Sequence, residues 1–154
     1  MVYRSSTLVP PAVLLVDDEA PFLETLSKRI AKRNLKVSTA LSGSEALDKL
    51  KAGGGASNYD VVILDVKMPG MDGLETLAAI KQKHPNMEVI MLTGHATVES
   101  AIEGMKAGAF DYLMKPCDID LLLAKIDRAV VKKREHEEKI LQARAQMITL
   151  KRGF

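Results

Sequence analysis

Side chains suited to metal and phosphate chemistry follow four short apolar segments of this sequence. They are Asp17 and Asp18, Asp65, Thr93 and Lys115. Each has an ordinary structural role open to it, as a helix cap, a turn residue or a solvated charge. Polar residues of related chemistry at the ends of four such segments nevertheless favour one shared site, provided that the fold brings those ends together.

Three carboxylates within a few ångströms of one another repel strongly. At about 4 Å and an effective dielectric constant of about 20, each pair costs about 4 kcal/mol. Such a group either takes up protons or binds a cation. A hard divalent ion with oxygen ligands is the natural partner, and Mg²⁺ uses few carboxylates while keeping several waters. The three histidines and the single cysteine show no spacing typical of a transition-metal site.

The apolar segments have the length and composition of β-strands. Residues 13–16, 61–64, 89–92 and, more weakly, 110–114 form nearly continuous apolar runs, which indicate strands buried on both faces. Residues 35–39 alternate in polarity and are typical of an edge strand.

Helices are predicted between and after these strands, where apolar residues recur at three- and four-residue spacing. The predicted helices lie around residues 22–30, 44–50, 74–83, 98–105 and 122–130. Strands that alternate with helices indicate an α/β protein with a parallel, doubly wound sheet. The ligand site of such a sheet lies beyond the carboxyl ends of the strands, where the strand order reverses. The polar residues named above would meet there.

Composition is that of an ordinary globular domain. The chain has 154 residues, of which 47% are hydrophobic and 27% charged, and its net charge of +2 gives no support to direct binding of nucleic acid. No apolar run approaches the length of a membrane span, and no signal peptide is evident. We therefore expect a cytoplasmic protein. The Gly-rich segment 53–58 is predicted to be a flexible loop, and it lacks the Lys-Ser/Thr of a phosphate-binding P-loop.

Five motifs follow one another in order along the chain. They are Leu15-Val-Asp-Asp18, Val61-Val-Ile-Leu-Asp65, Met68-Pro-Gly-Met-Asp-Gly73, Met91-Leu-Thr-Gly94 and Phe110-Asp-Tyr-Leu-Met-Lys-Pro116. Together they resemble the receiver domain of response regulators, the phosphorylated switches of two-component signalling. The resemblance covers about residues 12–131 and implies a flavodoxin-like sheet of five parallel strands in the order 2-1-3-4-5.

The resemblance also implies how phosphate and metal are held. Asp65 would accept a phosphoryl group from a sensor histidine kinase, so the chain would be a phosphoacceptor switch rather than an enzyme. Asp17 and Asp18 would hold Mg²⁺, with Asp65 and the backbone carbonyl of Lys67 as further ligands. A switch of this kind would promote its own phosphorylation and dephosphorylation.

Further side chains receive roles from the same resemblance. Lys115 would pair with the phosphoryl oxygens, and Thr93 would donate a hydrogen bond to one of them. Tyr112 matches the switch aromatic and would move with Thr93. Lys67 and His95 occupy positions that tune phosphoryl hydrolysis. The Lys115–Pro116 peptide is expected to be cis, as it usually is in this family.

The C-terminal residues differ in character from the rest. We expect an N-terminal tail at 1–11, a receiver domain at 12–131 and an extended C-terminal helix at 132–154. A heptad seam through Ile126, Val130, Ile140 and Met147 is interrupted by charged residues, so the extension is either a solvated helix or a surface that binds a partner or dimerises. A phosphorylation-dependent homodimer is one such outcome.

The output of the switch stays open at this level. Residues 93–97 and 108–112 are similar to receivers of nitrogen-regulation-type transcription activators, and no room remains for an output domain. The chain would act on a downstream protein target, or be the receiver fragment of a longer activator. Two other classes of protein are possible. A phosphatase with an aspartyl-phosphate intermediate would usually have an Asp at the position of Lys67. A flavodoxin-like cofactor binder would have a hydroxyl- and Gly-rich loop at the position of Asp17-Asp-Glu19.

Overall fold

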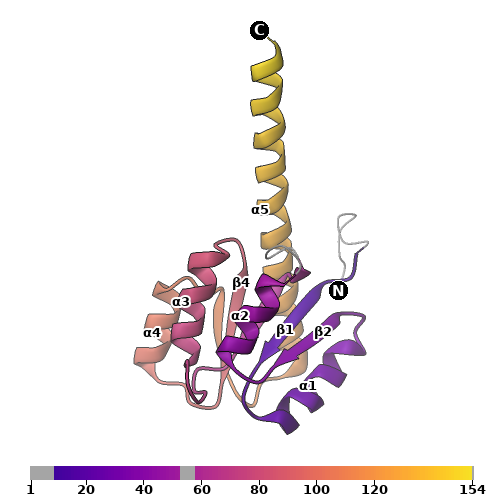
Figure 1. Ribbon diagram of the computed structural model, residues 1–154. Helices are drawn as coiled ribbons and strands as arrows, with labels where there is room; N and C mark the ends of the chain where they lie inside the picture. The colour runs from indigo at the N-terminus through magenta and orange to yellow at the C-terminus, as the bar shows by residue number, and fades with distance from the viewer. Residues whose placement is uncertain (1–8, 53–57, 154) are drawn as a thin grey trace.

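A five-stranded parallel sheet forms the centre of the molecule. The computed structural model describes residues 9–52 and 58–153, so the N-terminal residues 1–8 and most of the predicted Gly-rich loop lie outside the described residues. The strand order is β2-β1-β3-β4-β5, as predicted (Figure 1). The strands are β1 (Ala12–Val16), β2 (Lys36–Ala40), β3 (Val61–Leu64), β4 (Glu88–Thr93) and β5 (Asp111–Met114).

Burial explains which predicted strands lie where. Every residue of β3 and β4 is buried, as their continuous apolar sequences require of strands covered on both faces. The alternating segment became β2, which among the described strands pairs with β1 alone and is the edge strand expected. Strand β5, the weakest of the predictions, forms the opposite edge and pairs with β4 in register from Ile90 and Asp111.

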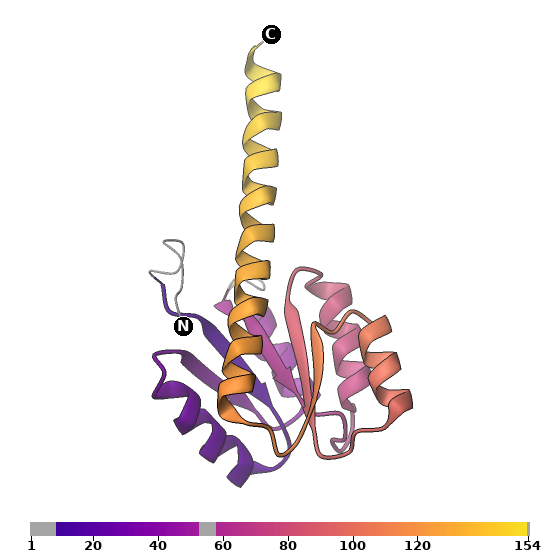
Figure 2. The same ribbon diagram turned by 180° about the vertical axis from the view of Figure 1, so that it is seen from behind.

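Helices cover both faces of this sheet. Helices α1 and α5 pack on one face, while α2 and α3 pack on the other and α4 lies beside α3 and β5 (Figures 1 and 2). The helices are α1 (Ala20–Ala31), α2 (Gly43–Lys51), α3 (Gly73–Lys83), α4 (Val98–Lys106) and α5 (Ile119–Gly153). Capping boxes start α3 at Asp72 and Glu75, and α4 at Thr97 and Ser100, so local hydrogen bonds fix both helix starts.

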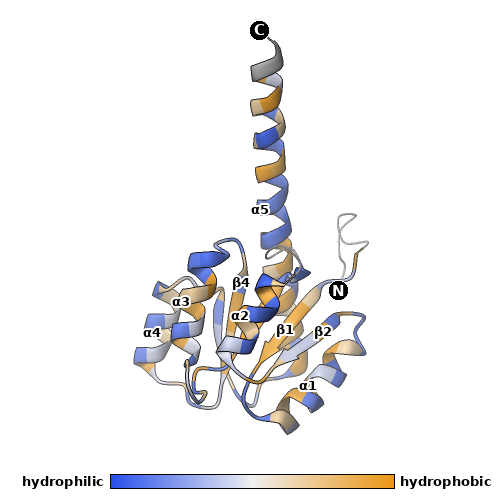
Figure 3. Cartoon of the chain, in the orientation of Figure 1, coloured by the Kyte–Doolittle hydropathy of each residue, from blue (hydrophilic) through white to orange (hydrophobic). Residues whose placement is uncertain are grey.

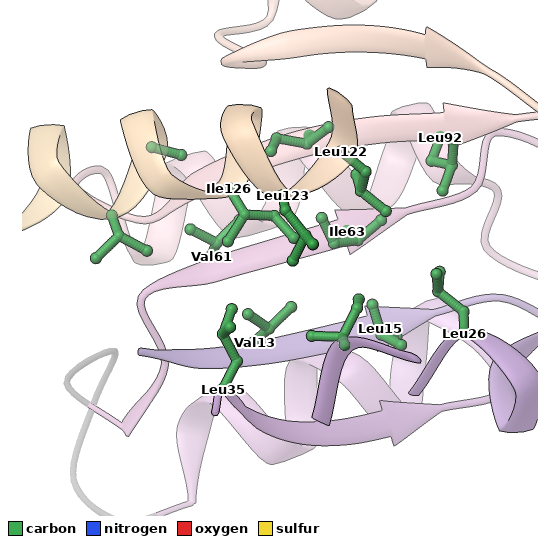
Figure 4. Close-up of a cluster of buried hydrophobic side chains, with 14 of the residues drawn as sticks. Val13, Leu15, Leu26, Leu35, Val61, Ile63, Leu92, Leu122, Leu123 and Ile126 are labelled. Carbon is green, nitrogen blue, oxygen red and sulfur yellow. The ribbon is translucent and has the colours of Figure 1, made fainter. Parts of the chain in front are cut away.

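The two faces bury separate apolar clusters. Figure 4 shows the cluster under α1 and α5, where side chains of the sheet meet side chains of the covering helices. The sheet contributes Leu15 and Ile63 to it, and the helices contribute Leu26, Leu122 and Ile126. Because neighbouring residues of a strand point to opposite faces, the alternate residues of β1 belong to the second cluster, under α2 and α3. Both clusters together hold the strands in register and so fix the positions of their carboxyl ends.

Helix α4 exposes the apolar stripe that identified it in the sequence. Val98, Ile102 and Met105 have exposed fractions of 73%, 50% and 48%, and the only buried residue of this helix is Gly104. The periodicity thus predicted the helix correctly, although the stripe does not pack into the core.

Helix α5 is a single helix of 35 residues that runs past the sheet. It starts at the carboxyl edge of the strands, crosses the sheet and leaves at the opposite edge (Figures 1 and 2). All side chains from 141 to 150 are exposed, and apolar residues alternate with polar ones along this part of the helix (Figure 3). Its exposed large apolar side chains are Leu141, Met147, Ile148 and Leu150. The predicted extended helix is therefore confirmed, and it projects away from the edge that carries Asp17 and Asp65.

An ion pair between Arg134 and Asp60 helps to anchor α5 where it leaves the domain. The Nε and Nη2 atoms of Arg134 each lie 3.1 Å from a carboxylate oxygen of Asp60, just before β3. Arg134 also donates to the carbonyl of Val9, and Asp60 accepts from the backbone N–H of Ala12. Two hydrogen bonds to one carboxylate make this a charge-assisted pair of the stronger kind.

Replacing Asp60 with asparagine should therefore lower the free energy of unfolding by about 1–3 kcal/mol. The change keeps the size of the side chain but removes its charge, and hydrogen exchange in residues 132–140 should quicken. Urea unfolding followed by circular dichroism measures the first effect. The matched control is Asp120→Asn, an exposed partner of Arg33, which should change stability by less than about 0.5 kcal/mol. Equal stabilities for the two variants would contradict this prediction.

Candidate functional site

The predicted residues meet at the carboxyl edge of the sheet. Asp17 directly follows β1, Asp65 follows β3, Thr93 ends β4 and Lys115 follows β5. Backbone hydrogen bonds tie these ends together: the Asp65 N–H donates to the Val16 carbonyl, and the Lys115 N–H donates to the Thr93 carbonyl. The position of each side chain is thus set by the ladder of the sheet.

The three aspartates form an acidic cluster. Asp17, Asp18 and Asp65 each offer one carboxylate oxygen, and these oxygens all lie within 4.8 Å of one another. Asp17 and Asp65 are almost fully buried, whereas Asp18 is exposed. An all-oxygen donor set that is open to solvent on one side fits Mg²⁺, which retains water ligands. The cluster could therefore hold the predicted metal ion.

Lys115 supplies the positive charge beside this cluster. Its ammonium lies 2.6 Å from Asp17, 3.5 Å from Glu19 and 3.8 Å from Asp65. Burial alone would lower the pKa of Lys115, but the hydrogen bond to Asp17 and the neighbouring carboxylates outweigh it and raise the pKa. Lys115 is therefore charged at neutral pH, although one ammonium offsets only part of the charge of three carboxylates.

The carboxyl of Asp65 experiences opposing influences. Burial raises its pKa most, because desolvation penalises the charged form, and the charge of Asp17 acts in the same direction. Hydrogen bonds from Thr93 and from the Val66 N–H, together with the charge of Lys115, lower it. The net result is a raised pKa, so an ionised Asp65 costs more in the folded chain than in the unfolded one.

This balance predicts how the metal-free protein responds to pH. Since the pKa is higher in the folded state, the contribution of Asp65 to stability is fully present below its unfolded pKa of about 3.9 and is lost as the pH rises through the folded value. An Asp65→Asn variant has no such loss. In chelator, urea midpoints of the variant and the wild type should diverge in favour of the variant from about pH 4 upward. A constant difference across this range would contradict the prediction.

A glycine positions the loop after Asp65. The Gly73 N–H donates to the Val66 carbonyl at 2.6 Å, and a Cβ atom at position 73 would overlap the backbone carbonyl of Asp65. The motif that contains Gly73 was noted in the sequence, but its backbone role was not inferred. A glycine at the first position of a helix is the signal that could have suggested a close approach.

An open cavity of about 470 Å³ lies over the acidic cluster. Lys67 and His95, the two residues predicted to modulate hydrolysis, both line this cavity beside Asp65. Its other lining residues are Asp18, Glu19, Met68, Pro69 and Asp72. Asp65 can therefore be reached from solvent through this cavity. Glu19, which contacts Lys115, had received no role in the sequence.

The two predicted switch residues occupy different surroundings. Thr93 is fully buried, and its Oγ1 accepts a hydrogen bond from the His95 N–H rather than capping α4. Tyr112 is half-buried, and its hydroxyl lies 2.5 Å from the Oγ of Ser100 in the first turn of α4. Ser100 was not singled out from the sequence, because a link across twelve residues has no local signal. The Lys115–Pro116 peptide is cis, as expected.

The strand order, the acidic cluster and the lysine after β5 together define a receiver-type α/β domain with an aspartate at its ligand edge. Residues 13–127 match the model of the response regulator receiver domain, and the chain belongs to this family. It is therefore a receiver domain of two-component signalling, a family of phosphoacceptor switches, as the sequence motifs predicted.

Relatives support the predicted likeness to nitrogen-regulation-type activators. The chain is 40% identical over 124 residues to the DNA-binding transcriptional regulator NtrC of Klebsiella pneumoniae, covering 80% of this chain and 26% of the relative. It is 36% identical over 118 residues to the transcriptional regulatory protein ZraR of Escherichia coli, covering 77% of this chain and 26% of that protein. The chain thus spans about a quarter of the length of these relatives.

Solved structures show the same fold. A response regulator receiver domain protein from Clostridium thermocellum superimposes with a TM-score of 0.76 at 37% identity, covering 80% of this chain and 97% of that one. A CheY-like receiver domain protein from Methanospirillum hungatei gives a TM-score of 0.76 at 28% identity, covering 83% of this chain and 99% of that one.

Among the helices of residues 9–52 and 58–153, none combines the length and the apolar character that a membrane span requires.

Proposed function

We propose that this chain accepts a phosphoryl group on Asp65 from a sensor histidine kinase, with Mg²⁺ held by Asp17, Asp18, Asp65 and the backbone carbonyl of Lys67. The observation that carries the proposal is the cluster of three carboxylate oxygens within 4.8 Å beside a charged lysine. Asp65 is the member of the cluster best placed to react, because it lies at the floor of the open cavity.

The chemistry needs no general base. A carboxylate oxygen of Asp65 attacks phosphorus as the bond from phosphorus to the nitrogen of the kinase histidine breaks, and the electron pair of that bond stays on the imidazole. The Val66 N–H donates to the Asp65 carboxylate and so fixes its orientation for the attack. Lys115 pairs with the phosphoryl oxygens, and Thr93 donates a hydrogen bond to one of them. Bound Mg²⁺ neutralises negative charge on the transferred group.

Incubation with acetyl phosphate and Mg²⁺ tests the proposal directly. Intact-mass spectrometry should show the gain of one phosphoryl group, and peptide mapping should place it on the segment that contains Asp65. Chelator should prevent the gain. A chain that stays unlabelled, or that is labelled on a residue outside the acidic cluster, would contradict the proposal.

The site supports a switch better than a phosphatase. Lys67 occupies the position two residues after Asp65 where a phosphatase would place an acidic proton donor, and it lines the cavity. Lys67 and His95 instead flank the place of the phosphoryl group and are proposed to tune its hydrolysis. Self-catalysed gain and loss of phosphate, without turnover of an external substrate, is the activity proposed here.

The switch itself is proposed to link Thr93 with Tyr112. When the phosphoryl group is present, Thr93 moves toward it and Tyr112 turns inward into the space that Thr93 leaves. Reversal of a 1:99 equilibrium needs roughly 5.5 kcal/mol of differential stabilisation, which several charge-assisted hydrogen bonds can supply. We assign the contact between the Tyr112 hydroxyl and the Ser100 Oγ to the state without phosphate.

We expect beryllofluoride, a phosphoryl mimic, to break that contact. Structures of the Mg²⁺-bound chain with and without beryllofluoride should show two rotamers of Tyr112, with the hydroxyl away from Ser100 in the mimic-bound form. One rotamer in both structures would rule out this coupling. A Tyr112→Phe variant should still bind beryllofluoride, since its ring is retained.

We further propose domain limits at 12–131, with a tail at 1–11 and a helical extension at 132–154. The early turns of the extension still contact the domain, since Lys132 pairs with Glu88 and Arg134 with Asp60. The signal would pass to a protein target or to an output domain of a longer activator. Sedimentation of the full chain and of a chain ending at Val131, with and without beryllofluoride, would show whether the extension dimerises.

A further inference from the structure

An aromatic ring lies against the ammonium of Lys115. The Nζ atom of Lys115 is 3.9 Å from the centroid of the Phe22 ring. Phe22 belongs to the first turn of α1 and is half-buried against the apolar cluster under α1 and α5. In the sequence Phe22 stands at the start of the helix predicted around residues 22–30, and none of the site motifs contains it.

The ring and the carboxylates act differently on the same charge. Asp17 accepts a hydrogen bond from the ammonium at 2.6 Å, and such a contact holds a particular N–H bond in a particular direction. The face of an aromatic ring attracts a cation through its quadrupole and offers no lone pair that competes for a proton. An ammonium on a ring face can therefore turn from one acceptor to another without losing the attraction.

The surroundings of Phe22 connect it to the reacting carboxylate. The ring lines a narrow cavity of about 10 Å³ together with Asp17 and Asp65. It also lines a groove of about 140 Å³ with Lys115 and Pro116. The side chain of Lys115 is only 14% exposed, so the ring replaces water on part of its surface. That desolvation strengthens the attraction between ring and ammonium.

We propose that Phe22 is a positioning residue for phosphoryl transfer, whose ring face keeps the Lys115 ammonium between Asp17 and Asp65. From there the Lys115 ammonium can leave Asp17 for the incoming phosphoryl oxygens. It stays in contact with the ring and does not have to be hydrated between the two ion pairs. The inference rests on the proposed function of Asp65 and adds a residue that acts through Lys115.

Fluorinated phenylalanines at position 22 test this role, because fluorine weakens the quadrupole while nearly keeping the shape of the ring. The rate of phosphorylation by acetyl phosphate at saturating Mg²⁺ should fall stepwise from the mono- to the di- to the trifluorinated ring, by about 3- to 10-fold in total. The Phe22→Tyr variant should retain the phosphorylation rate of the wild type. The rate of the Phe22→Leu variant should fall at least as far as that of the trifluorinated protein. Thermal unfolding of the fluorinated proteins should match that of the wild type.

The chain offers a matched control in a second ring beside a lysine. The centroid of the Phe110 ring lies 5.7 Å from the Nζ atom of Lys132, away from the acidic cluster. Trifluorination of this ring should leave the phosphorylation rate unchanged. A rate that is insensitive to fluorination at position 22, that rises with it, or that falls equally for position 110 would overturn the inference. Failure of the wild type to be labelled on Asp65 would instead overturn the proposed function, so the two failures are distinguishable.

Discussion

Asparagine at position 65 should leave the chain unable to gain a phosphoryl group from acetyl phosphate. The amide has almost the same size as the carboxylate, but its oxygen is a poor nucleophile and carries no charge. Asp65 is buried at the floor of the cavity, with only 3% of its surface exposed. We expect the labelled fraction to fall below detection under conditions that label the wild type fully, as measured by intact mass.

The control for this result is a change of the same type at a remote site. Asp120→Asn alters an exposed carboxylate on α5 and should leave labelling intact. Circular dichroism should show that the Asp65→Asn protein is folded, and in chelator it should be at least as stable as the wild type, because an ionised Asp65 is costly there. Undiminished labelling of Asp65→Asn would show that phosphate is accepted elsewhere.

The second large effect concerns Mg²⁺ and Asp17. Asp17→Asn removes one of three clustered carboxylates, and it also removes the negative charge that lies 2.6 Å from the Lys115 ammonium. We expect the affinity for Mg²⁺ to fall about 10- to 100-fold, which corresponds to about 1.4–2.7 kcal/mol. Titration calorimetry measures this directly, and the rise of the melting temperature with added Mg²⁺ gives an independent measure.

Glu19→Gln is the matched control for Asp17→Asn. Glu19 also contacts Lys115, but it is 65% exposed and does not belong to the cluster of three oxygens. Its loss should weaken Mg²⁺ binding by less than about threefold, since an exposed charge is well screened. Similar losses for both variants would mean that general negative charge, rather than direct coordination by Asp17, holds the ion.

Much of the fold could be predicted from local patterns. The apolar runs of β1, β3 and β4 have no polar alternation, so only strands covered on both faces satisfy them. The helices between them follow from the spacing of apolar residues, and the parallel sheet follows from the alternation of strand and helix. The cluster of Asp17, Asp18 and Asp65 could be predicted for the same reason: residues that directly follow parallel strands share one edge of the sheet.

The sequence by itself thus determined the strands, the helices and the set of polar residues at the carboxyl edge of the sheet. These features depend on periodicity and on the chain positions that directly follow each strand. Only the tertiary structure decided which distant side chains touch. The ring of Phe22 under Lys115, the hydroxyl of Tyr112 on Ser100 and the backbone approach at Gly73 join separate elements. Such contacts depend on how helices pack on the sheet, and the periodicity of one segment does not say which residue of another segment it will touch.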